Sequence, residues 1–214
     1  AQRADFISQF TPDYKFEYAQ SLSRHFVLHI GPTNSGKTYT ALQELKKAQK
    51  GAYLGPLRLL ALEVFDKLNG DGVACSLLTG EESIPVAGAG ITASTIEMAD
   101  FRPRYDAAII DEAQMIADPD RGSRWLDALC RVDAENLHVC LAPEAESLIV
   151  ELIGLMGADY EIMRHERLAT LRAVPALQGQ SDIRVNDATL SLSRRGARGI
   201  AGAGRQRGSR EAAI

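Results

Sequence analysis

Eight consecutive residues, GPTNSGKT at positions 31–38, have the types and spacing needed to hold a polyphosphate, and they fit the pattern G-x-x-x-x-G-K-[ST]. Glycines let the backbone approach a ligand closely and point several N–H groups inward, and the helix predicted to follow adds its own N-terminal N–H groups. In this pattern Lys37 would reach the β- and γ-phosphates and the Thr38 hydroxyl would ligate Mg²⁺. We expect Lys37 to face solvent in the loop. The candidate nucleotide-binding residues are Gly31, Pro32, Thr33, Asn34, Ser35, Gly36, Lys37 and Thr38.

A second candidate site lies in the segment YDAAIIDEAQM, residues 105–115. Phosphate hydrolysis also needs a carboxylate for the metal and a group that positions or activates water. Asp111 and Glu112 directly follow an apolar run, residues 107–110, whose composition predicts a buried strand. We expect Asp111 to hold Mg²⁺ through water and Glu112 to orient or deprotonate the attacking water. An isolated Asp-Glu pair often only caps a helix, but the position after an apolar strand favours the catalytic interpretation.

The rest of the chain predicts the elements that must position these two sites. Short apolar, β-prone runs alternate with segments whose apolar residues recur at helical spacing. The predicted strands are residues 25–30, 51–56, 74–80, 91–95, 106–112 and 136–143, and the predicted helices are 38–50, 57–69, 123–132 and 145–156. This alternation predicts an α/β fold with a mostly parallel sheet covered by helices on both faces. Ligands of such folds bind at the carboxyl ends of the strands, where residues 31–38 are expected to lie.

Composition limits the remaining possibilities. The chain has 214 residues, 45% of them hydrophobic, which suits one full domain and an additional segment. No apolar run is long enough to span a membrane, so we expect no membrane partner. The three cysteines, Cys75, Cys130 and Cys140, lack metal-ligand spacing and indicate reduced packing residues in a cytosolic-type compartment.

Charge is distributed unevenly along the chain. The net charge is −4; residues 1–168 contain 16 Lys and Arg against 25 Asp and Glu, and residues 169–214 contain 8 against 3. A broad basic face for nucleic acid is therefore excluded in the first part, where any such contact must be a local groove.

Several of these segments resemble one helicase family. The motif DEAQ, residues 111–114, resembles the DExH/DExQ box of superfamily 2 helicases. Together with GPTNSGKTY, YLGPLRLLALEVFDKLN, LLTGEE, STIEMAD and the longer IDEAQMIADPDRG, it resembles the ATP-dependent RNA helicases of the mitochondrial degradosome and their bacterial relatives. The resemblance extends over residues 24–168. It implies a RecA-like ATP-binding domain in residues 1–168, followed in 169–214 by a linker and an incomplete second RecA-like domain, or a mobile tail.

The resemblance also implies a role for individual residues. Lys37, Asp111, Glu112 and Gln114 would be catalytic, with Gln114 linking the nucleotide site to neighbouring motifs. Glu81 and Glu82 would repel phosphates, so we assign them to orientation or structure. The segments that would contact nucleic acid lie at predicted strand or helix ends and contain Pro56, Leu57, Arg58, Thr79, Gly80, Ser94 and Thr95.

The function implied by the resemblance is that of an ATP-dependent RNA helicase that uses ATP and Mg²⁺. RNA is the expected partner, with DNA as the alternative, and the resemblance adds an exoribonuclease as a protein partner. The expected location is the bacterial cytoplasm, with the mitochondrial matrix as the alternative. Two other interpretations stay open, namely another P-loop NTPase such as a small-molecule kinase, and a nucleotide-binding fragment without catalysis.

In helicases of this type a second RecA-like domain supplies arginine fingers, which are worth ~10³–10⁵-fold in rate in related phosphoryl-transfer sites. The segment ATLSLSRR, residues 188–195, resembles only the first strand of such a domain. We therefore expect the 214-residue chain to bind Mg·ATP, to hydrolyse it slowly and not to unwind RNA. A strand-displacement assay on a tailed RNA duplex tests this, and robust unwinding by the chain alone would contradict it.

Overall fold

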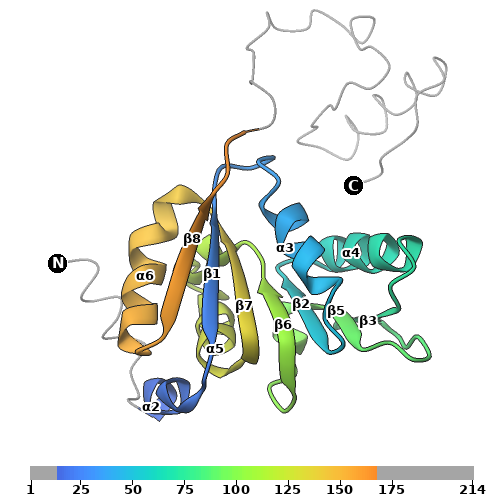
Figure 1. Ribbon diagram of the computed structural model, residues 1–214, viewed down its shortest axis with the longest axis horizontal. Coiled ribbons are helices and arrows are strands. Elements are labelled where there is room, and N and C mark those ends of the chain that lie inside the picture. The colour runs from blue at the N-terminus through green and yellow to red at the C-terminus, as the bar shows by residue number, and fades with distance from the viewer. Residues whose placement is uncertain (1–13, 168–214) are drawn as a thin grey trace, which may run out of the picture. The chain divides into compact units, whose positions relative to one another are not determined.

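A computed structural model describes residues 14–167 of the chain (Figure 1). The expectations for residues 168–214 lie outside the described residues. The strands are β1 (His25–Ile30), β2 (Gly51–Gly55), β3 (Cys75–Leu78), β4 (Ser83–Ile84), β5 (Ile91–Thr95), β6 (Arg104–Ile110), β7 (Asp133–Leu141) and β8 (Asp159–Arg164). The helices are α2 (Tyr14–Ser21), α3 (Lys37–Leu45), α4 (Arg58–Gly70), α5 (Gly122–Arg131) and α6 (Glu146–Leu155), with short 3₁₀ turns η1 (Ile96–Met98), η2 (Ala113–Ala117) and η3 (Pro143–Ala145).

The eight strands form one sheet in the order β4-β3-β5-β2-β6-β7-β1-β8. Every neighbouring pair is parallel except β3 with β4, which confirms the predicted mostly parallel sheet. The carboxyl ends of the parallel strands therefore share one edge of the sheet. The loops that follow β1, β2, β5, β6 and β7 all leave from this edge.

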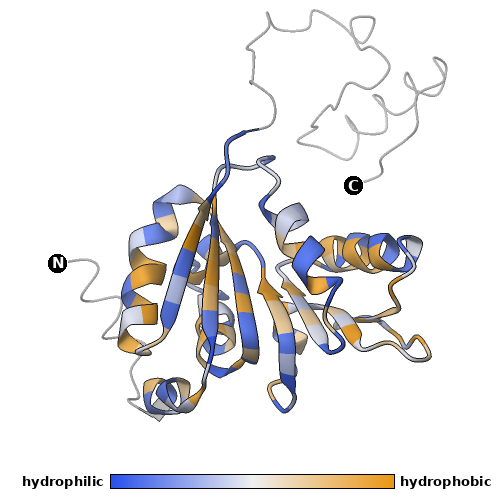
Figure 2. Cartoon of the chain, in the orientation of Figure 1, coloured by the Kyte–Doolittle hydropathy of each residue, from blue (hydrophilic) through white to orange (hydrophobic). Residues whose placement is uncertain are grey.

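Helices cover both faces of the sheet, as predicted, and each face has its own hydrophobic core (Figures 1 and 2). Successive residues of a strand point to opposite faces. In β6, Ala108 and Ile110 pack in the core under α5 and α6, whereas Ala107 and Ile109 pack in the core under α3 and α4. This burial on both faces of the sheet explains why residues 107–110 are all apolar.

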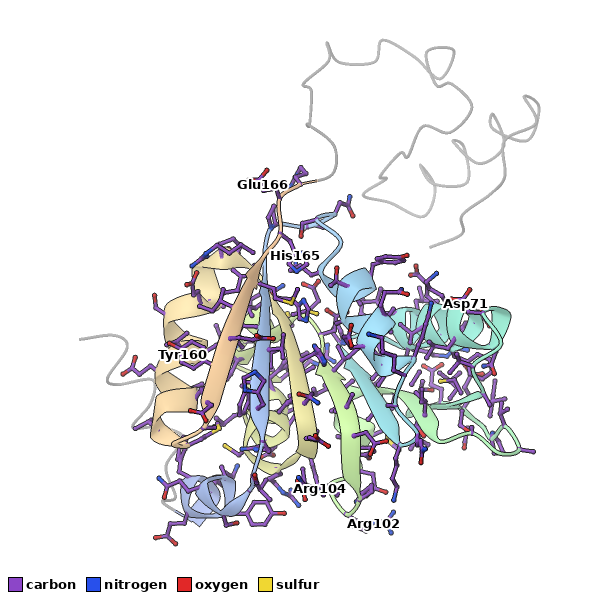
Figure 3. All side chains as sticks on the ribbon, in the orientation of Figure 1. Asp71, Arg102, Arg104, Tyr160, His165 and Glu166 are labelled. Carbon is purple, nitrogen blue, oxygen red and sulfur yellow. The ribbon has the colours of Figure 1, made fainter. Side chains whose placement is uncertain are left out.

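Strand β8 is the main element that the sequence pattern did not predict. All six of its residues are exposed, including Tyr160 at 42%, so its sequence DYEIMR has no apolar run (Figure 3). The strand is defined by its parallel backbone pairing with β1 at the edge of the sheet rather than by buried side chains. It brings His165 next to the loop that follows β1.

The three cysteines are free and buried, as predicted. Burial raises the pKa of the Cys75 and Cys130 thiols to about 11, and it also raises the pKa of the Cys140 thiol. Within residues 14–167, no helix is long and apolar enough to cross a membrane.

Candidate nucleotide-binding site

The loop between β1 and α3 has the backbone that a phosphate-binding loop requires. Asn34 and Gly36 adopt left-handed conformations, with φ of 59° and 82°. At Gly31 a side chain has no room, because a Cβ there would lie 2.5 Å from the His165 carbonyl oxygen and 2.8 Å from the Ser35 hydroxyl. Gly31 also donates its N–H to the Leu141 carbonyl of β7, 3.2 Å away. The loop is thus held against the ends of β7 and β8.

Lys37 is buried, with 7% of its surface exposed, so the expectation that it faces solvent in the loop is wrong. It is the first residue of α3, and its ammonium turns back to donate to the Gly31 and Pro32 carbonyls at 2.7 and 2.8 Å. These bonds close the loop around the lysine. A cation at the N-terminus of a helix is unfavourable without a neighbouring anion, and a polyphosphate would supply one.

Asp111 and Thr38, predicted to share the metal, are brought together by the fold. The Thr38 hydroxyl lies 3.1 and 3.2 Å from the two Asp111 carboxylate oxygens. Asp111 is 3% exposed and also accepts bonds from the Tyr53 hydroxyl at 2.8 Å and the Glu112 N–H at 3.0 Å. Burial raises the pKa of Asp111, and the donated bonds from Tyr53 and Thr38 oppose that rise.

Glu112 and Gln114 extend the site towards β7. Glu112 has a left-handed backbone, with φ of 50°, which is uncommon for a residue with a side chain. The Gln114 amide donates to the Glu112 carboxylate, and its carbonyl oxygen accepts the Ala142 N–H at 3.1 Å. Gln114 therefore joins the segment after β6 to the segment after β7, in the manner expected of a linking residue.

The donors and acceptors of this site fit Mg²⁺ and a polyphosphate. The Ser35 hydroxyl in the loop is buried and has no hydrogen-bond partner within the described part of the chain, so a phosphate oxygen would satisfy it. No group of three or more His, Cys, Asp or Glu side chains suited to a metal occurs among residues 14–167. Mg²⁺ does not need one, since it typically takes one or two protein oxygens and completes its shell with phosphates and water. Thr38 and Asp111 would supply those oxygens.

The seven residues expected to contact nucleic acid all lie at the carboxyl edge of the sheet, directly after β2 and β3 and in the last two positions of β5. Leu57 is 55% exposed and Gly80 is exposed, whereas Thr79, Ser94 and Thr95 are at least 93% buried. The side chains of these three serve the fold; Ser94, for example, donates to the Tyr53 carbonyl at 3.4 Å.

Arg58 links two of these segments. Its guanidinium pairs with Glu82 at 2.8 Å and with Glu81 at 3.5 Å. These contacts agree with the orienting role expected for the two glutamates, and the Arg58 side chain is 42% exposed.

Three functional side chains were missed by reasoning from the sequence. Tyr53 reads as an ordinary strand residue, yet its hydroxyl holds Asp111. Trp125 is fully buried, and its indole N–H donates to the Asp111 carbonyl at 3.0 Å. In DPDRG, residues 118–122, the Asp118 carboxylate shapes the loop by accepting the N–H groups of Asp120 and Arg121. For Trp125 and Asp118, the only signal in the sequence is that DPDRG lies close to DEAQ.

A row of three histidines lies beside the loop. The ring nitrogens of His29 lie 3.1 Å from His165 and 3.0 Å from His138. His29 is fully buried. Its burial and the neighbouring histidines lower its pKa to about 4, and burial also lowers the pKa values of His138 and His165.

The row predicts that lowering the pH below 6.5 destabilises the domain. Between pH 6.5 and 4 the unfolded chain binds a proton at His29 that the folded chain does not, so the free energy of unfolding should fall as the pH is lowered. One such group contributes a slope of up to roughly 1.4 kcal/mol per pH unit. Thermal or urea unfolding across this range measures it. His29→Gln should flatten the slope, and His25→Gln on the same strand should retain it; equal slopes would contradict the assignment.

The parallel sheet with helices on both faces, the glycine-containing loop after β1 and the buried aspartate after β6 define a P-loop nucleotide-binding domain. A family model described as the DEXQ-box helicase domain of Suv3 matches residues 12–165, and the chain belongs to this family.

Named relatives agree with the family assignment. The chain is 39% identical over 187 residues to the mitochondrial ATP-dependent RNA helicase SUV3 of Saccharomyces cerevisiae, covering 84% of this chain and 25% of that protein. It is 41% identical over 181 residues to human mitochondrial SUPV3L1, covering 82% and 23%, and 41% identical over 192 residues to the Arabidopsis thaliana mitochondrial helicase DExH16, covering 89% and 34%. The chain therefore spans about a quarter to a third of these relatives. A solved structure, the Hef helicase domain of Pyrococcus furiosus, matches with a TM-score of 0.47 and 18% identity over 78% of this chain and 40% of that one.

Proposed function

We propose that this chain is the ATP-binding and ATP-hydrolysing part of an RNA helicase, which couples hydrolysis to movement on RNA or to its unwinding. The observation that carries the proposal is the pairing of the Thr38 hydroxyl, at the end of the phosphate loop, with the buried Asp111 carboxylate of the DEAQ motif. The family assignment and the names of the relatives support ATP as the nucleotide and RNA as the polymer.

The residues of the site divide the work of hydrolysis. The loop N–H groups, Ser35 and Lys37 bind and orient the phosphates, and Thr38 and Asp111 hold Mg²⁺. When bound, Mg²⁺ neutralises charge on the β- and γ-phosphate oxygens. Glu112 orients the attacking water and accepts its proton, and Gln114 holds the Glu112 carboxylate in place.

RNA is proposed to lie along the carboxyl edge of the sheet, across the ends of β2, β3 and β5. Because Thr79, Ser94 and Thr95 are buried, backbone N–H groups and the exposed Leu57–Arg58 turn would make the contacts. Such contacts grip phosphates without reading sequence. DNA is the alternative polymer.

The remaining parts of the proposal rest on resemblance. An exoribonuclease partner and a boundary between residues 168 and 169 follow from the resemblance to degradosome helicases. The relatives are mitochondrial by name, which favours the mitochondrial matrix and leaves the bacterial cytoplasm without support.

An ATPase assay with and without single-stranded RNA tests the proposal. Slow hydrolysis that RNA accelerates is the expected result. A small-molecule kinase would transfer phosphate to an added acceptor and would not respond to RNA. A non-catalytic fragment would bind nucleotide without turnover in either condition. Either of these outcomes would overturn the proposed function.

A further inference from the structure

Arg121, in the loop before α5, contacts three separate segments at the carboxyl edge of the sheet. Its guanidinium donates to the Pro56 carbonyl at 2.6 Å and to the Glu97 carboxylate at 2.7 and 3.0 Å. It also lies over the Trp125 ring, 5.5 Å from the ring centroid. Pro56 begins the segment after β2, and Glu97 lies in η1, directly after β5. Arg121 therefore joins two segments assigned to RNA to the aromatic ring that reaches the nucleotide site.

Trp125 connects this cluster to the catalytic carboxylates. Its indole N–H donates to the Asp111 carbonyl, which belongs to the peptide between Asp111 and Glu112. The N–H of the same peptide donates to the Asp111 carboxylate at 3.0 Å. Both ends of this peptide are thus fixed immediately before Glu112, whose φ of 50° needs such support. A shift of Trp125 would change the orientation of the Glu112 side chain.

The backbone around Arg121 is closely constrained, and this fixes the position from which its side chain extends. A Cβ at Gly122 would lie 2.2 Å from the Ile116 carbonyl oxygen, so only glycine lets α5 begin against η2. Asp118 accepts the Arg121 N–H at 2.8 Å through its carboxylate and the Gly122 N–H at 2.9 Å through its carbonyl. The loop therefore holds Arg121 between η1 and the DEAQ segment.

We propose that Arg121 is a positioning residue that couples RNA binding to the Asp111–Glu112 site. RNA bound across the ends of β2 and β5 would move Pro56 and Glu97, and the guanidinium transfers that movement to Trp125 and to the peptide before Glu112. Lysine cannot replace it, because only the planar guanidinium can donate in two directions and stack on a ring at once. This inference rests on the proposed function and names the residue that links its two halves.

The test measures how strongly RNA and nucleotide affect each other's binding. The dissociation constant of Mg²⁺ with a non-hydrolysable ATP analogue is measured for the chain with and without saturating single-stranded RNA. In the wild-type chain RNA should change this constant by about 5- to 150-fold, the usual range of coupling between sites. In Arg121→Lys and Arg121→Ala that factor should fall towards one, while the RNA-free constant stays close to wild type.

Two further variants separate coupling from simple structural support. Arg102→Ala removes an arginine that is 90% exposed, pairs with nearby Asp100 and precedes β6, at the opposite end of that strand from Asp111 (Figure 3); it should keep the wild-type factor. Glu97→Gln should reduce the factor, and combining it with Arg121→Lys should add little, because both act through one contact. Glu97→Gln with Arg121→Lys also keeps the proposal testable if the alanine variant does not fold.

Several results would overturn the inference. If both Arg121 variants keep the coupling factor, Arg121 does not couple the sites. If the Arg121 variants also weaken nucleotide binding without RNA and lower the thermal stability of the chain, the role of Arg121 is structural. If RNA binds the wild-type chain without changing nucleotide affinity, the coupling fails and ATP binding by the chain still stands. If RNA does not bind at all, the proposed function fails as well.

Discussion

Replacing Glu112 with glutamine is expected to lower ATP turnover by ~10²–10⁴-fold while ATP still binds, because the loss of a general base usually has an effect of this size. Glutamine has the shape of glutamate and can accept the Gln114 amide bond through its remaining oxygen, so the linkage to Ala142 should survive. It cannot take a proton from water. Steady-state hydrolysis in the presence of RNA, measured beside nucleotide affinity, gives the two quantities needed.

A matched control is Glu151→Gln, an exposed glutamate on α6 away from the carboxyl edge, which should leave turnover unchanged. Turnover near the wild-type value in Glu112→Gln would remove Glu112 from the chemistry. A loss of nucleotide affinity equal to the loss of turnover would instead place Glu112 in binding, and the base would have to be sought elsewhere at the same edge.

The elements that bury their side chains could be predicted from the sequence. Residues 107–110 of β6 are all apolar because a hydrophobic core packs on each face of the sheet, and this composition can be read from the sequence. Strand β8 could not be predicted in this way, since its stability comes from backbone bonds to β1 and its side chains are exposed. Its place at the edge matters for the site, because it sets His165 against Gly31.

Some residues of the candidate site could likewise be predicted from the sequence and others could not. The loop at 31–38 and the Asp111–Glu112 pair are local patterns, so their chemistry could be read directly. Tyr53 could not, because its contact with Asp111 depends on β2 lying beside β6, with Leu54 opposite Ile110. Pairing between distant strands fixes such contacts, and no short motif records it. The burial of Lys37 was missed for a related reason, since its partners are the carbonyls of its own folded loop.

Lys37→Ala is expected to abolish tight Mg·ATP binding. Removing one partner of a buried, hydrogen-bonded charge pair costs ~2–5 kcal/mol, which corresponds to at least ~30-fold in dissociation constant. The lysine also closes the loop through the Gly31 and Pro32 carbonyls, so the variant should lose some stability, at ~1.5–3 kcal/mol for a hydrogen bond to a charged group. Nucleotide titration must therefore be read together with thermal unfolding of the same sample.

Lys47→Ala is the matched control, because Lys47 lies just after α3, is 70% exposed and pairs only with neighbouring Glu44 among the described residues. It should bind Mg·ATP as the wild-type chain does. If Lys37→Ala folds and binds with unchanged affinity, Lys37 does not contact the phosphates. The charge of the γ-phosphate would then have to be balanced by Mg²⁺ at Thr38 and Asp111 together with the loop N–H groups. In that case the affinity of the chain for ATP should depend steeply on the Mg²⁺ concentration.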